Sequence, residues 1–238
     1  RTPAPAVDHY WVFSCGAGSV CGAASEAVTV SPPPPPPPPP PNYLMIGDSI
    51  SLGYLPGVTA ALDGEYNVTH SRGNAGNANS IAHRLDCYLE QVGGRPDVVT
   101  FNAGIHDLAR GQEWLAPQVY TALITNVTER LVRAARRVVF ITTTPVPTNG
   151  SDPTVAACPE GILDSDVRIY NAAAVRVANA VGAEVLDLHQ VITAACGGVG
   201  YTSCSLQRAN NPHFVDAGWA VLARAVASWI INSTATSR

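Results

Sequence analysis

The sequence contains no lysine, so arginine fills all 14 of its Lys and Arg positions. Charged residues make up 13% of the chain, and the formal net charge is −4. A surface that follows a phosphate backbone needs clustered basic side chains, so we expect no nucleic-acid partner. The chain also lacks an uninterrupted apolar run of the roughly 20 residues that cross a bilayer, because Arg224 and Ser228 break the longest one, Ala217–Ile231. We therefore predict no membrane span.

Paired Cys-x-x-Cys spacings are absent, and no spacing of His, Asp or Glu resembles a metal site, so we expect no metal ion and no other cofactor. The sequence has six cysteines, an even number that favours disulfides. Two pairs would close short loops that bring their Cα atoms to about 5.5 Å, and the third would join the remaining thiols. The predicted pairs are Cys15–Cys21, Cys196–Cys204 and Cys87–Cys158.

Four Asn-x-Ser/Thr sequons point in the same direction as the cysteines. Such sequons accept N-linked glycans only in a secretory route, and disulfides persist in oxidising compartments. Together they predict a secreted, extracellular glycoprotein. The predicted glycan acceptors are Asn67, Asn126, Asn149 and Asn232.

Ten consecutive prolines, Pro32–Pro41, divide the chain. Proline fixes φ and has no amide donor, so this run predicts a polyproline II rod of roughly 30 Å, at about 3.1 Å per residue. The rod is either an inert linker or a stalk that contacts neighbouring glycoprotein modules. Residues 1–31 before it are expected to be the tail of a preceding module. Residues 42–238 after it are expected to form the globular domain.

From Asn42 onward, short runs rich in β-branched residues alternate with segments of helical periodicity. This alternation is typical of βαβ units and a parallel sheet. It predicts an α/β fold, a three-layer α/β/α sandwich with a five-stranded, flavodoxin-like sheet, whose crevice lies at the carboxyl ends of the strands. The expected strands are Tyr43–Ile46, Tyr66–Thr69, Val98–Asn102, Val138–Thr143 and Glu184–Leu188.

Two helices are clear from capping and periodicity. One begins near Asp164 or Asp166, carries a single apolar stripe and ends at Gly182, which suits the position after a helix. The last helix is expected from Asp216 to about Ile231.

Polar motifs follow several of the expected strands. Gly47-Asp48-Ser49 puts a serine on the tight turn between the first strand and a helix, where backbone amides favour a developing oxyanion. Alone, this motif favours the simpler interpretation that Ser49 or Ser51 merely caps the helix. Its companions change the interpretation: Asn74-Ala75-Gly76 follows the second strand, Gly104-Ile105-His106-Asp107 follows the third, and Asn210-Asn211-Pro212-His213 precedes the last helix.

These four blocks, in this order, resemble the SGNH (GDSL-type) hydrolase family, whose members carry Gly-Asp-Ser, a block II glycine, Gly-x-Asn-Asp and Asp-x-x-His. The resemblance covers residues 42 to about 232. It implies that Ser49 is the nucleophile, His213 the general base, and the amides of Ser49 and Gly76 oxyanion donors. Acyl transfer needs these groups: a hydroxyl, a nearby imidazole and donors for the alkoxide. The supporting residues are Asp48, Gly104 and Asp107, which would brace the loops of the site.

The chain departs from the family pattern at His106, which stands where the family has the block III asparagine. An imidazole N–H can donate to an oxyanion in place of the amide, but only in the right tautomer. The local sequence resembles a branch of the family with Gly-x-His-Asp in this block. The histidine is therefore either that branch's own oxyanion donor or the mark of a decayed site.

A second departure is Asn210, which takes the place of the triad aspartate three residues before His213. A neutral amide orients the imidazole without stabilising its charged form fully, so we expect a weakened Ser–His dyad. The function predicted is an extracellular ester hydrolase that removes small acyl groups, with glycans as the expected substrate class. The alternative is a non-catalytic module in a secreted glycoprotein wall, coat or filament.

Overall fold

The computed structural model describes residues 8–10, 28–30, 35–109, 114–149, 156–158, 161–199 and 201–235. Two compact units, Arg1–Pro39 and Pro40–Arg238, make up the chain. In the first unit, β1 (Asp8–Tyr10) pairs antiparallel with β2 (Val28–Val30). The predicted Cys15–Cys21 disulfide lies outside the described residues.

The second unit is built on a five-stranded sheet in the order β4-β3-β5-β6-β7. Every neighbouring pair in it is parallel, which confirms the predicted sheet. The last strand ends two residues earlier than predicted, because the Asp187 side chain accepts the Gln190 amide and begins a helix there. The strands are β3 (Asn42–Ile46), β4 (Asn67–His70), β5 (Val98–Phe101), β6 (Arg137–Ile141) and β7 (Glu184–Leu186).

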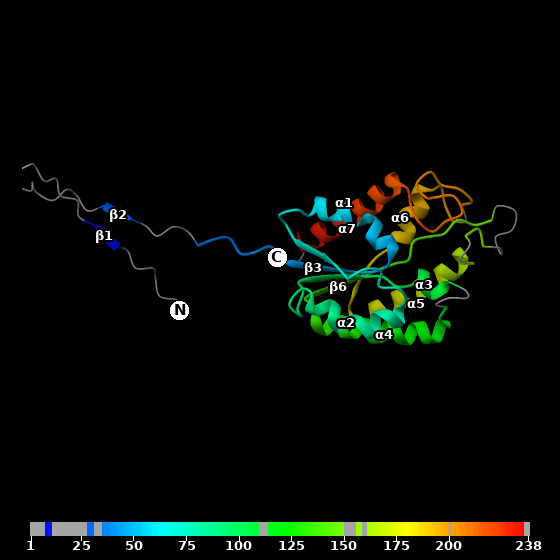
Figure 1. Cartoon of the computed structure of the whole chain (residues 1–238), viewed down its shortest axis with the longest axis horizontal. Helices are drawn as coiled ribbons and strands as arrows, with labels where there is room; N and C mark the ends of the chain where they lie inside the picture. The colour runs from blue at the N-terminus through cyan, green and yellow to red at the C-terminus, as the bar shows by residue number, and fades with distance from the viewer. Residues whose placement is uncertain are drawn as a thin grey trace, which may run out of the picture. The chain divides into compact units, whose positions relative to one another are not determined.

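Helices cover both faces of this sheet, which gives the predicted three layers (Figure 1). One face carries α1 (Ser49–Ala61), α6 (Leu188–Ala195) and α7 (Asp216–Ala235). The other face carries α2 (Ala78–Glu90), the short α3 (Ile105–Leu108), α4 (Pro117–Ala134) and α5 (Asp164–Val181). The predicted end of α5 is confirmed, since Gly182 adopts the left-handed conformation with φ 80°.

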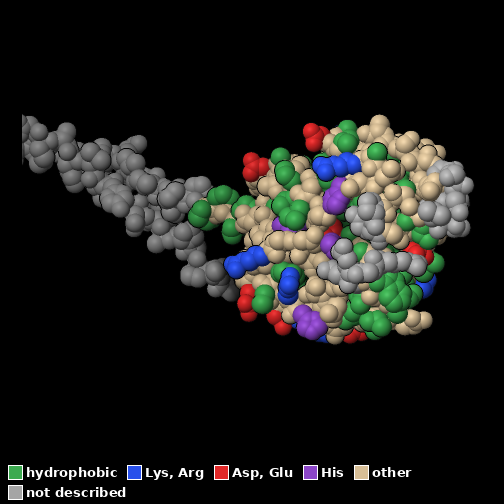
Figure 2. Space-filling model, turned by 45° about the vertical axis from the view of Figure 1, so that its right-hand side comes forward, with side chains coloured by type: hydrophobic (Ala, Val, Ile, Leu, Met, Phe, Trp, Pro, Cys, Tyr) green, Lys and Arg blue, Asp and Glu red, His purple; other side chains and the backbone are tan. Residues whose placement is uncertain are grey.

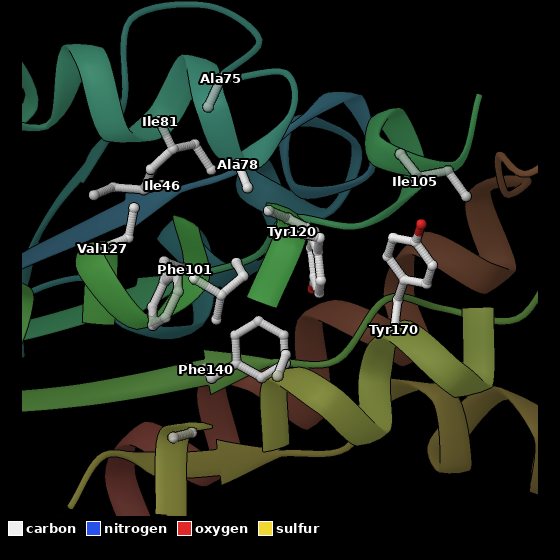
Figure 3. Packing of buried hydrophobic residues seen from close by; sticks show 14 of the residues in the cluster. Ile46, Ala75, Ala78, Ile81, Phe101, Ile105, Tyr120, Val127, Phe140 and Tyr170 are labelled. Atoms are coloured by element: carbon white, nitrogen blue, oxygen red, sulfur yellow. The ribbon is translucent and has the colours of Figure 1, made fainter. Parts of the chain in front are cut away.

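Side chains of β3 alternate between the two faces, as the period of a strand requires. Tyr43 and Met45 join the apolar cluster under α1 and α7, whereas Leu44 and Ile46 join the cluster under α2, α4 and α5. Figure 3 shows the second cluster, in which Phe101 and Phe140 meet edge to face with centroids 5.3 Å apart. Burial on both faces explains why the three central strands, β3, β5 and β6, are mainly apolar.

The order of the strands places the site. The chain passes from β3 to β4 on one side and then to β5 on the other side of β3. In open α/β sheets, ligands bind where the direction of winding changes, at the carboxyl ends of the strands. The loops after β3, β4 and β5 meet at that point, and they carry three of the four polar motifs.

Candidate active site

Ser49 is the first residue of α1, directly after the turn that ends β3. We call Gly47–Ser49 the nucleophile turn. The Asp48 side chain accepts the Ile50 amide at 2.8 Å and so caps the helix. A Cβ atom on Gly47 would lie 2.6 Å from Ser51 Oγ, so only glycine fits there. The first amides of a helix have no partner within it, so this turn offers both a hydroxyl and N–H donors.

His213 reaches the nucleophile turn from the far end of the sequence. Its Nε2 atom lies 2.8 Å from Ser49 Oγ. The two residues that the sequence singled out as nucleophile and base therefore meet at hydrogen-bond distance. His213 belongs to the segment 201–215 between α6 and α7, which we call the histidine loop.

The residue that holds the imidazole is Asn211, where the sequence analysis expected Asn210. Asn211 Oδ1 lies 2.8 Å from His213 Nδ1 and also accepts the His213 backbone amide at 2.8 Å. A backbone N–H can only donate, so the atom facing His213 is the amide oxygen, and Nδ1 carries the proton. Nε2 is then free to accept the Ser49 hydroxyl proton.

Asn210 is exposed and adopts a left-handed conformation with φ 51°. Asparagine tolerates that conformation better than most residues. The expected role of Asn210 is therefore corrected: it shapes the loop, and its neighbour contacts the base. The signal that was missed is a local one, because an Asn side chain commonly bonds the backbone two residues later.

A buried glutamine, which the sequence analysis did not single out, secures the histidine loop. Gln207 Nε2 donates to the carbonyl oxygens of Pro145 and Pro212, both at 3.0 Å. Tyr201 donates its hydroxyl to Gln207 Oε1. The loop is thereby tied to the segment after β6 and to the residue immediately before His213.

The disulfide predictions have mixed outcomes. A disulfide joins Cys196, at the end of α6, to Cys204 in the histidine loop, which confirms that pair. The predicted Cys87–Cys158 bond is wrong: Cys87 is an exposed thiol on α2, and the buried Cys158 has its sulfur 3.6 Å from the Ile162 carbonyl.

The turn after β4 brings Asn74 and Gly76 to the site. The Ala75 amide donates to the Gly47 carbonyl at 2.9 Å, so this turn packs on the nucleophile turn. The Gly76 amide donates to Asn74 Oδ1 at 2.8 Å, and Asn74 Nδ2 lies 3.3 Å from His106 Nε2. Two of the three groups expected as oxyanion donors, Gly76 and His106, thus contact one asparagine side chain.

The expected supporting residues lie beneath these turns. Asp107 is fully buried in α3, and its Oδ1 accepts the Ala78 amide at the start of α2. A Cβ atom on Gly104 would lie 2.0 Å from Thr143 Oγ1, so only glycine lets the backbone come this close to the segment after β6. Burial raises the pKa of the Asp48 carboxyl above its usual range, because the charged form loses its hydration.

A second Ser–His contact, between Ser51 and His70, lies on the buried side of the nucleophile turn. Ser51 Oγ lies 2.7 Å from both His70 Nε2 and the Asp48 carbonyl, and His70 Nδ1 lies 2.7 Å from the Ser71 carbonyl. Ser51 is buried, so this pair braces the turn from inside. Burial lowers the pKa of His70 below its ordinary value.

Ser49 and His213 open into a cavity of about 180 Å³. Apolar side chains form most of its remaining wall. The lining consists of the polar Ser49, His106 and His213 and the apolar Ile50, Ile105, Ala109, Ile162 and Pro212. Such a cavity suits an uncharged acyl group beside a reactive hydroxyl.

Within the described ranges, no three His, Cys, Asp or Glu side chains gather as a metal site. The described helices also include none long and apolar enough to cross a membrane. Figure 2 shows Arg and acidic side chains scattered among uncharged ones on one face.

The predicted glycan acceptors differ in their surroundings. Asn126 on α4 and Asn232 on α7 are exposed, and Asn149 is partly buried. Asn67 is exposed, but its Nδ2 donates to the Pro40 carbonyl at 2.9 Å. A glycan on that nitrogen would remove one of its two donor hydrogens.

The fold agrees with comparisons to known proteins. The GDSL-like Lipase/Acylhydrolase family matches residues 45–223. No curated protein matches the sequence. Among solved structures, the acetyl xylan esterase AlAXEase is 17% identical, with a TM-score of 0.65 over 79% of this chain and 99% of its own. A lipase/acylhydrolase from Enterococcus faecalis is 18% identical, with a TM-score of 0.63 over 81% and 96%. The acetylxylan esterase Axe2 from Geobacillus stearothermophilus is 17% identical, with a TM-score of 0.59 over 80% and 94%.

Proposed function

Since the chain belongs to the GDSL-like lipase/acylhydrolase family, we propose that it is a serine ester hydrolase that removes small acyl groups from extracellular glycans. The observation that carries the proposal is the 2.8 Å contact between Ser49 Oγ and His213 Nε2. An activated hydroxyl beside an imidazole in an apolar cavity is the arrangement that acyl transfer requires.

The reaction begins with attack of Ser49 Oγ on the ester carbonyl. The bond from Oγ to carbon forms as the hydroxyl proton passes to His213 Nε2, and the carbonyl electron pair moves onto oxygen. Asn211 keeps the imidazole in the tautomer that accepts this proton. The leaving alcohol then takes the proton from His213, and water, activated by the same imidazole, hydrolyses the acyl-Ser49 ester.

The neutral Asn211 makes this a weakened dyad. A carboxylate would stabilise the imidazolium with a full negative charge, and an amide oxygen offers only a dipole. Charge-assisted hydrogen bonds contribute roughly 1 to 2 kcal/mol more than neutral ones. We therefore expect measurable but slow turnover.

The size of the cavity supports a short acyl group. A cavity of about 180 Å³ accommodates an acetyl or a slightly longer chain. The acetyl xylan esterases among the similar structures agree with a glycan ester, although fold alone does not define a substrate. A secreted location is supported by the Cys196–Cys204 disulfide and by exposed sequons at Asn126 and Asn232.

The deciding experiment is turnover of p-nitrophenyl acetate by the purified full chain, with labelling of Ser49 by a fluorophosphonate. We expect slow hydrolysis and labelling, and the loss of both in Ser49→Ala. Ser228→Ala, an exposed serine on α7, is the matched control and should retain full activity.

A second candidate, a non-catalytic module of a glycoprotein wall, coat or filament, is favoured by the neutral partner of His213. In that role, the polyproline segment would contact neighbouring modules. A wild-type chain that hydrolyses no ester and whose Ser49 is not labelled would replace the hydrolase proposal with this one.

A further inference from the structure

One asparagine side chain contacts two of the three groups that were expected to stabilise the oxyanion, Gly76 and His106. Asn74 Oδ1 accepts the Gly76 amide at 2.8 Å, and Asn74 Nδ2 lies 3.3 Å from His106 Nε2. The turn that carries Asn74 is itself bonded to the nucleophile turn, from the Ala75 amide to the Gly47 carbonyl. Asn74 thus stands beside His106, which lines the cavity of Ser49.

These contacts determine where the protons are. The Gly76 backbone amide can only donate, so the atom that faces it must be the oxygen of the Asn74 carboxamide. The carboxamide nitrogen then faces His106 Nε2. Because that nitrogen can only donate, Nε2 must accept, and the proton of a neutral His106 is on Nδ1. His106 therefore has the wrong tautomer to donate from Nε2 to an oxyanion.

The same bonds change which group can serve as donor. Gly76 N–H and His106 Nε2 are both engaged with Asn74. The Asn74 carboxamide, by contrast, has two hydrogens, and the contact with His106 uses one of them. The second hydrogen remains for an acceptor from outside the chain, on an exposed side chain whose neighbour His106 lines the cavity of Ser49.

We propose that Asn74 is a catalytic residue of this site, whose remaining amide hydrogen stabilises the oxyanion in place of the block III asparagine that the chain lacks. The inference rests on the proposed ester hydrolysis. His106 is then a positioning residue, because its Nε2 and the Gly76 amide hold the two ends of the carboxamide. As the Ser49 Oγ bond to carbon forms, the negative oxygen accepts from Asn74 Nδ2 and from the amide of Ser49 at the start of α1.

The first test compares two replacements of Asn74. Loss of one oxyanion donor lowers kcat by about 10² to 10³. The kcat of Asn74→Ala should therefore be roughly a hundredfold below that of the wild type, with little change in KM. Asn74→Asp keeps an oxygen for the Gly76 amide but removes the donor hydrogens, so its kcat should be reduced by at least the same factor. Asn79→Ala, an exposed neighbour on α2, is the control and should match the wild type.

The opposite result has a clear meaning. Asn74→Ala frees the Gly76 amide. If Gly76 is the true donor and Asn74 only covers it, kcat would stay level or rise in Asn74→Ala, and the proposal would be overturned. Retained activity in Asn74→Asp would also overturn it, because that variant preserves the turn without the donor.

A second test concerns His106. His106→Ala removes the acceptor that holds Asn74 and should lower kcat by about tenfold with KM unchanged. His106→Gln places an amide oxygen near the former Nε2 and should recover most of that loss. If His106→Gln is as slow as His106→Ala, the imidazole acts directly on the reaction and Asn74 is not its target.

A measurement without substrate completes the test. The ¹⁵N chemical shifts of the His106 ring in the full-length protein should show the neutral tautomer with the proton on Nδ1, and a proton on Nε2 would overturn the proposal. Failure of the proposed ester hydrolysis can be distinguished from failure of the Asn74 proposal. A wild-type chain without any esterase activity overturns both proposals, whereas an active wild type with unaffected Asn74 variants overturns only this one.

Discussion

The nucleophile turn and the histidine loop supply the two reacting side chains, but they are built by different means. Regular backbone holds the turn: β3 ends at Ile46, α1 begins at Ser49, and Asp48 caps the helix between them. In the histidine loop, described backbone pairing is limited to an isolated bridge between Gln207 and Phe214 and a few single hydrogen bonds, such as the one from the Thr148 amide to the Tyr201 carbonyl. Side chains and one disulfide supply the rest. The base therefore depends on individual contacts, and the nucleophile depends on the fold.

The dependence of the nucleophile turn on backbone geometry is clearest at Gly47. Gly47 has no room for a methyl group, because Ser51 Oγ and Cβ would lie 2.6 and 2.9 Å from it. Gly47→Ala should therefore move Ser51 and Ser49 together, destabilise the fold by about 1 to 3 kcal/mol and lower kcat by a hundredfold or more. Urea unfolding and ester hydrolysis measure the two effects.

The control is Gly64→Ala, at an exposed glycine with φ 76° and no atom near its Cβ position. It should cost about 1 to 2 kcal/mol of stability for the left-handed conformation and leave kcat unchanged. Equal kcat values in the two variants would show that the nucleophile turn is not the rigid element described above.

The contrast between the nucleophile turn and the histidine loop also explains which parts of the structure the sequence could predict. The five strands, the start of α1 and the position of Ser49 follow from periodicity and capping, which act over a few residues. The partner of His213 does not, because a loop between α6 and α7 can direct Asn210 or Asn211 at the ring. Gln207 was missed for a related reason: its partners, Pro145 and Pro212, become visible only when the chain is folded.

A replacement of Gln207 tests how much its side-chain hydrogen bonds contribute to holding the histidine loop. Gln207→Leu keeps the volume but leaves the carbonyls of Pro145 and Pro212 without their donor, at about 1 to 3 kcal/mol for each buried group. We expect a lower urea midpoint and a kcat reduced at least tenfold, because His213 loses its fixed distance to Ser49. Gln190→Ala, exposed on α6, should change neither quantity. An unaffected Gln207→Leu would assign the loop's rigidity to the disulfide.

A replacement of Asn211 tests how the partner of His213 affects the base itself. Asn211→Asp places a carboxylate oxygen 2.8 Å from His213 Nδ1, where it stabilises the imidazolium of the transition state. A gain of about 1.4 kcal/mol corresponds to a factor of ten, so kcat should rise about tenfold with KM nearly constant. Asn210→Asp is the matched control, and its exposed side chain should give no gain. A gain in Asn210→Asp alone would restore the family spacing as the correct guide.

The smallest expected effect lies under the nucleophile turn, at His70. Its burial lowers the pKa of the ring below the ordinary value of 6.5 that the unfolded chain would have. As pH falls through 6.5 toward the folded pKa, the unfolded chain binds a proton that the folded chain does not. Stability contributed by neutral His70 is therefore present above about pH 6.5 and is lost progressively below it, with a slope of at most about 1.4 kcal/mol per pH unit.

His70→Gln keeps an acceptor for Ser51 and cannot titrate, so its unfolding free energy should depend less on pH than that of the wild type between pH 7.5 and 5.5. Urea unfolding at several pH values gives the difference, and effects of Asp48, which is present in both proteins, largely cancel in it. His83→Gln, at an exposed histidine on α2, should follow the wild-type curve. If the unfolding free energy of His70→Gln also follows the wild-type curve, protonation of His70 does not strain the turn. In that case Ser51 donates to the Asp48 carbonyl and accepts a hydrogen bond from the charged ring of His70. That result would make the nucleophile turn as adaptable as the histidine loop.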